Sequence, residues 1–248
     1  MAEGRGAAAR ADGQAGLPAD GPATTIHLAR HGRTVLNALG RVQGWSDSPL
    51  TAAGAETATR LGAGLGRSLR ASGSAISAVY AADMLRHGQT AELAARGLGL
   101  DGPILRDERL RELDFGRFEG ALTGEMWAEV APALGYADER EAFADPGFDY
   151  RAALEAIARI GSDAELVAEA PADVATRALA ALTAIADAHP GADVLVVSSG
   201  ITILTVLATL GVDLSRAAGG IGNGAVSRLE HRAGSWLVRS VNDLAYVA

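Results

Sequence analysis

The chain has 248 residues and a hydrophobic content of 48%, which suits one large α/β domain or two small ones and excludes disorder throughout. Its formal net charge of -8 excludes a general nucleic-acid binder, because binding to a polyanion needs clustered Lys and Arg over a broad face. Any anion site must therefore be a local basic pocket. The absence of cysteine excludes disulfides, thiolate metal sites and a catalytic thiol, and it fits a cytoplasmic protein.

Residues 1–23 are rich in Ala, Gly, Asp and Arg and lack the continuous apolar core of a signal peptide, so we predict a flexible N-terminal tail. Residues 24–248 are predicted to form a single domain. Apolar stretches within it are interrupted by Gly, Ser or charge within about a dozen residues, short of the roughly 18 that a membrane span needs. We therefore expect no membrane and no nucleic acid as partners, and a homodimer is compatible with the sequence.

Strand-like and helix-like segments alternate along the domain, which favours a sheet covered by helices on both faces. Thr51 is a predicted helix N-cap because it follows a Pro-Leu pair and precedes a helical pattern. In chain order we predict a strand at 25–29, a helix at 51–71, a strand at 76–81, helices at 83–97 and 172–188, a strand at 194–198, a helix at 201–211, and strands at 225–231 and 235–241.

The segment 120–170 differs from its surroundings, because scattered aromatic residues stand among prolines and acidic residues with no strand rhythm. An insertion of this kind between core elements favours a helical cap over a pocket. Its aromatic side chains are expected to pack within the cap rather than to stack on a ligand. They are Trp127, Tyr136, Phe143, Phe148 and Tyr150.

The most informative motif ends the first predicted strand, where an apolar run stops at Arg30, His31 and Gly32. This order places a guanidinium beside an imidazole at the carboxyl end of a strand, where open α/β sheets bind their ligands. Gly32 lets the backbone approach a ligand closely. The motif therefore predicts a phosphate-handling catalytic loop.

Two further blocks stand at 83–91, around Arg86, and at 110–120, around Glu112. Together with the first motif they resemble the histidine phosphatase superfamily, which includes phosphoglycerate mutase-like enzymes, over about residues 25–243. The resemblance implies a three-layer α/β/α sandwich with a mostly parallel mixed sheet. Further positions that carry it are Asn37, Gly40, Arg41, Gln43, Gly44, Asp47, Gly54, Glu169, Asp173, Arg177, Asn242 and Asp243.

The resemblance also implies roles that the side chains can fill. His31 would attack phosphorus and form a phosphohistidine. Arg30 and Arg86 would grip the phosphoryl oxygens, because a guanidinium fork matches their geometry. Glu112 would protonate the leaving alcohol and then deprotonate water, and the scheme needs no metal or other cofactor. Substrate or phosphate contacts are expected from Asn37, Arg41, Gln43, Gly44, Ser199 and Gly200, besides the two arginines.

One position departs from the family pattern. In this family, the strand that corresponds to 194–198 leads into a Ser-His-Gly turn, and the histidine of that turn is the second imidazole of the pocket. This chain has Ser199 in place of that histidine. A serine hydroxyl donates a hydrogen bond but supplies no positive charge. Loss of one preorganised donor costs about a hundred- to a thousand-fold in rate, so the sequence predicts slow or re-purposed phosphoryl transfer.

His87 offers another imidazole, at a position where the family has a small residue. Adjacent helical positions point about 100° apart, so Arg86 and His87 are not both expected to face the pocket. Compensation for Ser199 by His87 is therefore the less favoured expectation.

The sequence thus favours a phosphomonoesterase that acts on a small phosphorylated metabolite. A phosphate-binding protein that has lost turnover is one alternative. Phosphoglycerate mutase activity is another, although residues 113–116 read Leu-Asp-Phe-Gly where the mutases carry a basic signature. A serine hydrolase built on Ser199 is least favoured, because Val197 and Ile201 stand where a nucleophile elbow needs glycine.

Overall fold

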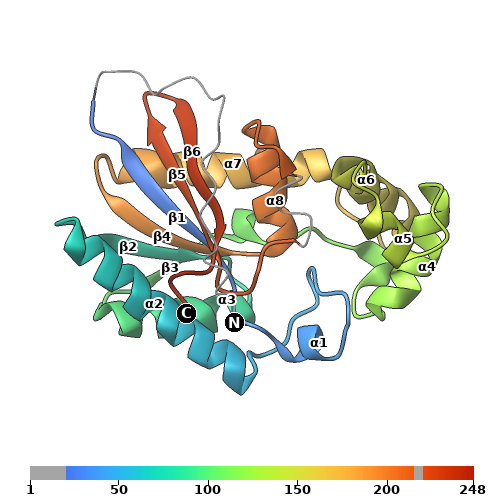
Figure 1. Cartoon of the computed structure of the whole chain (residues 1–248), viewed down its shortest axis with the longest axis horizontal. Coiled ribbons are helices and arrows are strands. Elements are labelled where there is room, and N and C mark those ends of the chain that lie inside the picture. Colours follow the sequence, from blue (N-terminus) through green and yellow to red (C-terminus); the bar gives the residue numbers. More distant parts are fainter. Residues whose placement is uncertain (1–20, 215–219) are drawn as a thin grey trace, which may run out of the picture.

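The computed structural model describes residues 21–214 and 220–248, which form a sheet flanked by helices and a helical lobe to one side of it (Figure 1). Most of the predicted tail, residues 1–20, lies outside the described residues. In the described part of the chain, no helix is both long enough and apolar enough to cross a membrane.

The sheet has six strands in the order β3-β2-β4-β1-β5-β6. Its first four strands are mutually parallel, whereas β5 and β6 are antiparallel to their neighbours. This arrangement confirms the predicted mixed, mostly parallel sheet. The strands are β1 (Thr24–Arg30), β2 (Ile76–Ala81), β3 (Ile104–Arg106), β4 (Asp193–Ser198), β5 (Val226–Arg232) and β6 (Ser235–Asp243).

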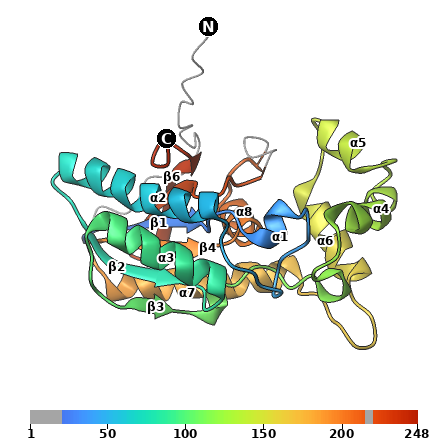
Figure 2. The same cartoon turned by 90° about the horizontal axis from the view of Figure 1, so that it is seen from below.

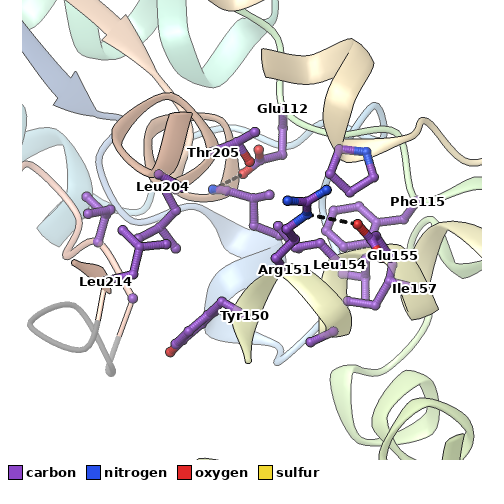
Figure 3. A pocket seen from close by; sticks show the side chains of 18 of the residues that line it. Glu112, Phe115, Tyr150, Arg151, Leu154, Glu155, Ile157, Leu204, Thr205 and Leu214 are labelled. Atoms are coloured by element: carbon purple, nitrogen blue, oxygen red, sulfur yellow. Dashed lines mark hydrogen bonds and ion pairs between the residues drawn. The ribbon is translucent and has the colours of Figure 1, made fainter. Parts of the chain in front are cut away.

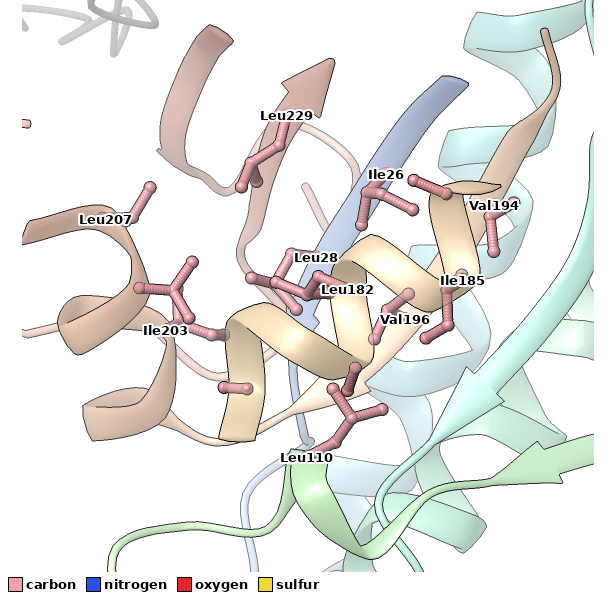
Figure 4. Packing of buried hydrophobic residues seen from close by; sticks show 14 of the residues in the cluster. Ile26, Leu28, Leu110, Leu182, Ile185, Val194, Val196, Ile203, Leu207 and Leu229 are labelled. Atoms are coloured by element: carbon pink, nitrogen blue, oxygen red, sulfur yellow. The ribbon is translucent and has the colours of Figure 1, made fainter. Parts of the chain in front are cut away.

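Helices cover both faces of the sheet, so the three-layer expectation is also confirmed. On one face, Ile26 and Leu28 of β1 pack with Val196 of β4 against the helices α7 (Pro171–Ala188) and α8 (Gly200–Thr209) (Figure 4). Alternate residues of the same strands point the other way, because side chains alternate along a strand. They pack against α2 (Ala52–Ala71) and α3 (Leu85–Leu98).

Local sequence explains the start and the packing of α2. Thr51 caps the helix, and its hydroxyl accepts a hydrogen bond from the amide of Gly54 at 3.0 Å, as the sequence predicts. Gly62 lets α2 lie directly on α3, since a Cβ there would stand 1.9 Å from the carbonyl oxygen of Ala94. The element at β3 was missed because it has only three residues, two of them exposed, and so shows no strand pattern.

The insertion 120–170 holds three helices, α4 (Thr123–Ala133), α5 (Glu139–Ala144) and α6 (Tyr150–Ile160). Both views show them as a lobe beside the sheet, away from α2 and α3 (Figure 2). The lobe has its own apolar cluster, which includes Trp127 and Leu154. The loop after β3 passes through two single-turn 3₁₀ helices, Glu108–Leu110 and Gly116–Phe118. It contributes Phe115 to that cluster and so connects the lobe to the sheet. A short helix, α1 (Val35–Ala38), follows β1.

Candidate active site

His31 follows β1 directly and lies at the carboxyl end of the parallel strands. Its Nδ1 lies 2.8 Å from the carbonyl oxygen of Gly32, so Nδ1 is the protonated nitrogen and Nε2 carries the lone pair. Burial lowers the pKa of His31 well below its ordinary value of 6.5, and the charges of Arg30 and Arg86 lower it further. The imidazole is therefore neutral at ordinary pH and presents Nε2 as a nucleophile.

Two arginines lie beside this imidazole, Arg86 fully buried and Arg30 half-buried. Arg86, in the first turn of α3, donates to the carbonyl oxygens of Gly44 at 2.7 Å and Ser46 at 3.1 Å, and to the Asp47 carboxylate at 3.0 Å. Arg30 donates through Nη1 to the carbonyl of Ile221. Burial lowers the pKa of Arg30 while the charge of Glu112 opposes that shift, and the guanidinium stays charged at working pH.

Four buried nitrogens at the edge of this site have no hydrogen-bond partner among residues 21–214 and 220–248: Arg30 Nε, Arg86 Nε, Gln43 Nε2 and His87 Nδ1. The amide of Gln43 is oriented by its oxygen, which accepts bonds from the hydroxyls of Thr34 at 2.9 Å and Ser48 at 2.7 Å. Buried donors without partners are costly unless a ligand meets them. Several donors, two of them on guanidinium groups, suit a phosphoryl anion.

Glu112 is held at the N-terminus of α8. Its carboxylate accepts the amides of Ile201 at 3.0 Å and Thr202 at 2.8 Å, and the Thr202 hydroxyl at 3.0 Å. A carboxylate is favoured there by the helix dipole and by amides that have no partner within the helix. The backbone of Glu112 is fixed as well, since Arg177 donates to its carbonyl at 2.9 Å.

A cavity of about 960 Å³ opens beside these groups (Figure 3). Arg30, His31, Gln43 and Glu112 form its polar end. The remaining wall comes from the lobe and from α8 and is mostly apolar. Its larger apolar side chains are Phe115, Met126, Trp127, Phe143, Phe148, Tyr150, Leu154, Ile157, Ile201, Leu204, Leu214 and Ile221.

The structure brings half of the predicted contact residues to the cavity wall, and Arg86 and Ser199 are among those that lie behind it. Asn37, Gln43 and Gly200 line it. Gly44 lies behind Arg86 and accepts its hydrogen bond, so the glycine positions the arginine. Arg41 is not in the lining: it is exposed and donates to the carbonyl of Gly120 at 2.6 Å, because its backbone pairs with the start of the lobe. This position does not favour the expected substrate contact from Arg41, which stays a prediction.

Ser199 and His87 form a pair that no local sequence pattern indicates. His87 Nε2 lies 2.7 Å from Ser199 Oγ, and both residues are fully buried. The His87 ring also meets His31 edge to face, with centroids 5.3 Å apart and planes at 88°. Arg86 and His87, which the sequence did not lead us to expect on the same side of the helix, both lie near His31 from the first turn of α3, although neither lines the cavity itself.

Three supporting residues were missed at the sequence level. Thr202 holds Glu112, Thr90 accepts the Gly32 amide at 3.0 Å, and Asn223 donates to the His31 carbonyl at 3.0 Å. Thr90 lies four residues after Arg86 and so on the same face of α3, which was the available signal. Across the part of the chain that the structure describes, no three His, Cys, Asp or Glu side chains are grouped as a metal site requires.

A family model for the histidine phosphatase superfamily (branch 1) matches residues 26–244. The chain belongs to this superfamily. The structure superposes on a phosphoglycerate mutase from Bacillus anthracis with a TM-score of 0.81 and 31% identity, over 92% of this chain and 96% of that one. A mycobacterial glucosyl-3-phosphoglycerate phosphatase shares the fold, with a TM-score of 0.64, 21% identity, and coverage of 89% and 99%.

Among curated relatives, a probable phosphoglycerate mutase, GpmB, of Salmonella choleraesuis (strain SC-B67) is 44% identical over 94 residues. The match covers 38% of this chain and 40% of the relative. The chain thus spans about two fifths of the length of the curated relatives it matches. Superfamily membership accounts for the shared arrangement of strands and helices, whereas the reaction must be argued from the site.

Proposed function

We propose that the protein is a phosphomonoesterase that hydrolyses a small phosphorylated molecule through a phosphohistidine on His31. One observation carries the proposal: a buried, neutral imidazole lies within the field of Arg30 and Arg86 and keeps Nε2 unprotonated, because Nδ1 donates to Gly32. Glu112 lies on the same cavity. A nucleophile, two cations for the phosphoryl oxygens and a carboxyl group for proton transfer are the parts that a two-step displacement needs.

In the first step, which Glu112 enters in its protonated form, His31 Nε2 attacks phosphorus and the bond from phosphorus to the ester oxygen breaks. Glu112 gives its proton to the departing alcohol and is left as the carboxylate. In the second step, Glu112 takes a proton from water, whose oxygen attacks phosphorus while the Nε2–P bond breaks. The products are the alcohol and inorganic phosphate. Arg30 and Arg86 stabilise the charge that gathers on the phosphoryl oxygens in both steps.

The cavity supports a substrate whose organic part is largely apolar. Besides Arg30, the described cavity lining contains one further cation, Arg151. It is exposed and pairs with Glu155 at 3.0 Å. A second phosphate or a carboxylate on the substrate would therefore meet little positive charge within the described lining. Burial of apolar surface contributes about 25 cal/mol per Å², so an aryl or alkyl phosphate suits this wall better than a phosphoglycerate.

The proposal is tested by hydrolysis of p-nitrophenyl phosphate and by acid-labile, alkali-stable phosphate trapped on His31 from labelled substrate. His31→Gln should lose both signals. His189→Gln is the matched control. That histidine precedes the amino end of β4, at the end of the parallel strands opposite the site, and it bonds the Tyr80 hydroxyl. Hydrolysis that persists in the His31 variant, or a label found on another residue, would contradict the proposal.

Two alternatives have distinct signatures. A phosphate-binding protein without turnover is favoured by Ser199, an uncharged residue beside the site, and would bind phosphate with no hydrolysis over hours. A mutase, suggested by the names of relatives, would isomerise 3-phosphoglycerate rather than release phosphate from it. The mutase is disfavoured because 3-phosphoglycerate carries a carboxylate besides its phosphate, and the cavity wall offers few cations to bind it.

A further inference from the structure

His87 is a buried imidazole that the proposed reaction does not use. It is the third residue of α3, is fully buried, and touches the nucleophile on one side and Ser199 on the other. Packing alone does not require an imidazole here, because an apolar side chain would fill the space without leaving the buried Nδ1 unpartnered.

We propose that His87 is a positioning residue for phosphoryl transfer, which fixes the His31 ring and the Ser199 hydroxyl against the phosphoryl site. This inference rests on the proposed function, since it assigns a helper to the same nucleophile. It also implies that the second imidazole of the site comes from α3 and not from the turn after β4.

The capping of α8 explains why Ser199 is available to His87. A serine at an N-cap normally accepts hydrogen bonds from the second and third amides of its helix. Ser199 caps α8 without such a bond, because the amides of Ile201 and Thr202 are taken by Glu112. Its hydroxyl is left to bond His87 instead, so the general acid and the His87–Ser199 pair share one helix end.

The contact with His31 fixes the plane of the nucleophile. A hydrogen bond from Nδ1 to the Gly32 carbonyl still allows the ring to rock about that bond. The edge-to-face contact with His87 removes this freedom, so that Nε2 keeps one direction. Burial lowers the pKa of His87 well below its ordinary value, with Arg86, His31 and Arg106 acting in the same direction, so the ring that packs on His31 is neutral.

A swap of the two positions provides the decisive experiment. H87A removes the ring, S199H alone would crowd a second ring against His87, and H87A/S199H moves the imidazole back to the turn. Each variant is compared with the full-length wild-type protein and with H189Q. Turnover of p-nitrophenyl phosphate gives kcat and KM separately, thermal melting reports folding, and orthovanadate affinity reports the phosphoryl site without turnover.

We expect H87A to lower kcat about a hundred-fold, at the lower end of the loss when one preorganised group is removed, and to weaken vanadate binding, with KM little changed. H87Q keeps a hydrogen-bonding group toward Ser199 and should recover part of the loss. The double variant should return to within about tenfold of wild type. If His87 were merely structural, H87A, H87Q and the double variant would all have a lower melting temperature, and the double variant would not recover kcat.

Three results would overturn the inference. One is a folded H87A protein with kcat and vanadate affinity within about twofold of wild type. The second is a double variant no better than H87A. The third is labelling of Ser199 by a fluorophosphonate, which would make Ser199 and His87 a nucleophile and its base. Failure of the proposed function is separate: wild type would then show no hydrolysis and no phosphohistidine, while vanadate affinity would still test His87.

Discussion

Two histidines four residues apart, one within β1 and one directly after it, have opposite charges around them. His27, within β1, donates from Nε2 to the Asp193 carboxylate at 2.6 Å, and Ser74 bonds the other oxygen of that carboxylate. His31, at the end of the strand, is surrounded by the cations Arg30 and Arg86. Both are nearly inaccessible, at 2% and 3% exposure, so burial does not distinguish them.

The charge of the neighbours therefore decides what each imidazole does. A carboxylate partner makes His27 a cross-link between the middle of β1 and Asp193, the first residue of β4, which is a structural role. Burial, together with the cationic neighbours, keeps His31 neutral and leaves Nε2 for chemistry. Four predictions test this contrast, beginning with the largest expected effect.

His31→Gln should abolish hydrolysis, with a loss of about 10⁴-fold or more, because enzymatic accelerations of 10⁶-fold or greater depend on the nucleophile in a covalent mechanism. Steady-state kinetics with p-nitrophenyl phosphate measure the loss. His27→Gln, the matched change four residues earlier in β1, should leave kcat within a few-fold. Equal losses in both variants would remove the distinction between the two sites.

Glu112→Gln should lower kcat by about 10²- to 10⁴-fold, the usual contribution of general acid–base catalysis. An amide keeps one oxygen to accept the amides of α8 but cannot transfer the proton. The loss should shrink for p-nitrophenyl phosphate, whose leaving group needs little protonation, relative to an alkyl phosphate. An equal loss on both esters would assign Glu112 to positioning alone.

His27→Ala should destabilise the fold by about 2–3 kcal/mol without comparable loss of kcat, because it leaves the Asp193 carboxylate short of a charge-assisted partner. Urea denaturation measures the free energy of unfolding. His27→Gln retains a donor and should recover part of the loss. A loss of kcat that exceeds the fraction of protein unfolded would contradict a structural role.

The free energy of unfolding should fall in two separate pH ranges, or windows, as the pH is lowered. The pKa values of His31 and His87 are lowered by burial and nearby cations, so stability is full above about 6.5 and falls as pH drops below it, by at most about 1.4 kcal/mol per pH unit for each group. Burial alone would raise the pKa of Asp193, but its hydrogen bonds from His27 and Ser74 lower it overall.

The contribution of Asp193 is thus present above about 3.9 and is lost only as pH falls further. H87Q should flatten the first window, and Asp193→Asn should flatten the second. Chemical denaturation from pH 7 to pH 3 measures both. A single window, unchanged by H87Q, would contradict the neutral, buried state of His87.

Much of the fold was accessible from periodicity. β2 has the predicted bounds, and the other predicted strands and helices are found within two residues of their predicted ends. These elements are long and strongly patterned, and their apolar residues alternate on strands or recur along helices. β3 and α1 were missed because three or four residues contain too few repeats to establish a pattern.

By itself the sequence determined that Arg30 and His31 end a buried strand, and that Arg86 and Glu112 belong to blocks typical of the superfamily, because those features are local. Only the tertiary structure decided that Arg41 turns away, that Glu112 caps α8, and that His87 meets Ser199 across 112 positions of chain. Such contacts depend on how whole helices pack on the sheet, which no local pattern records.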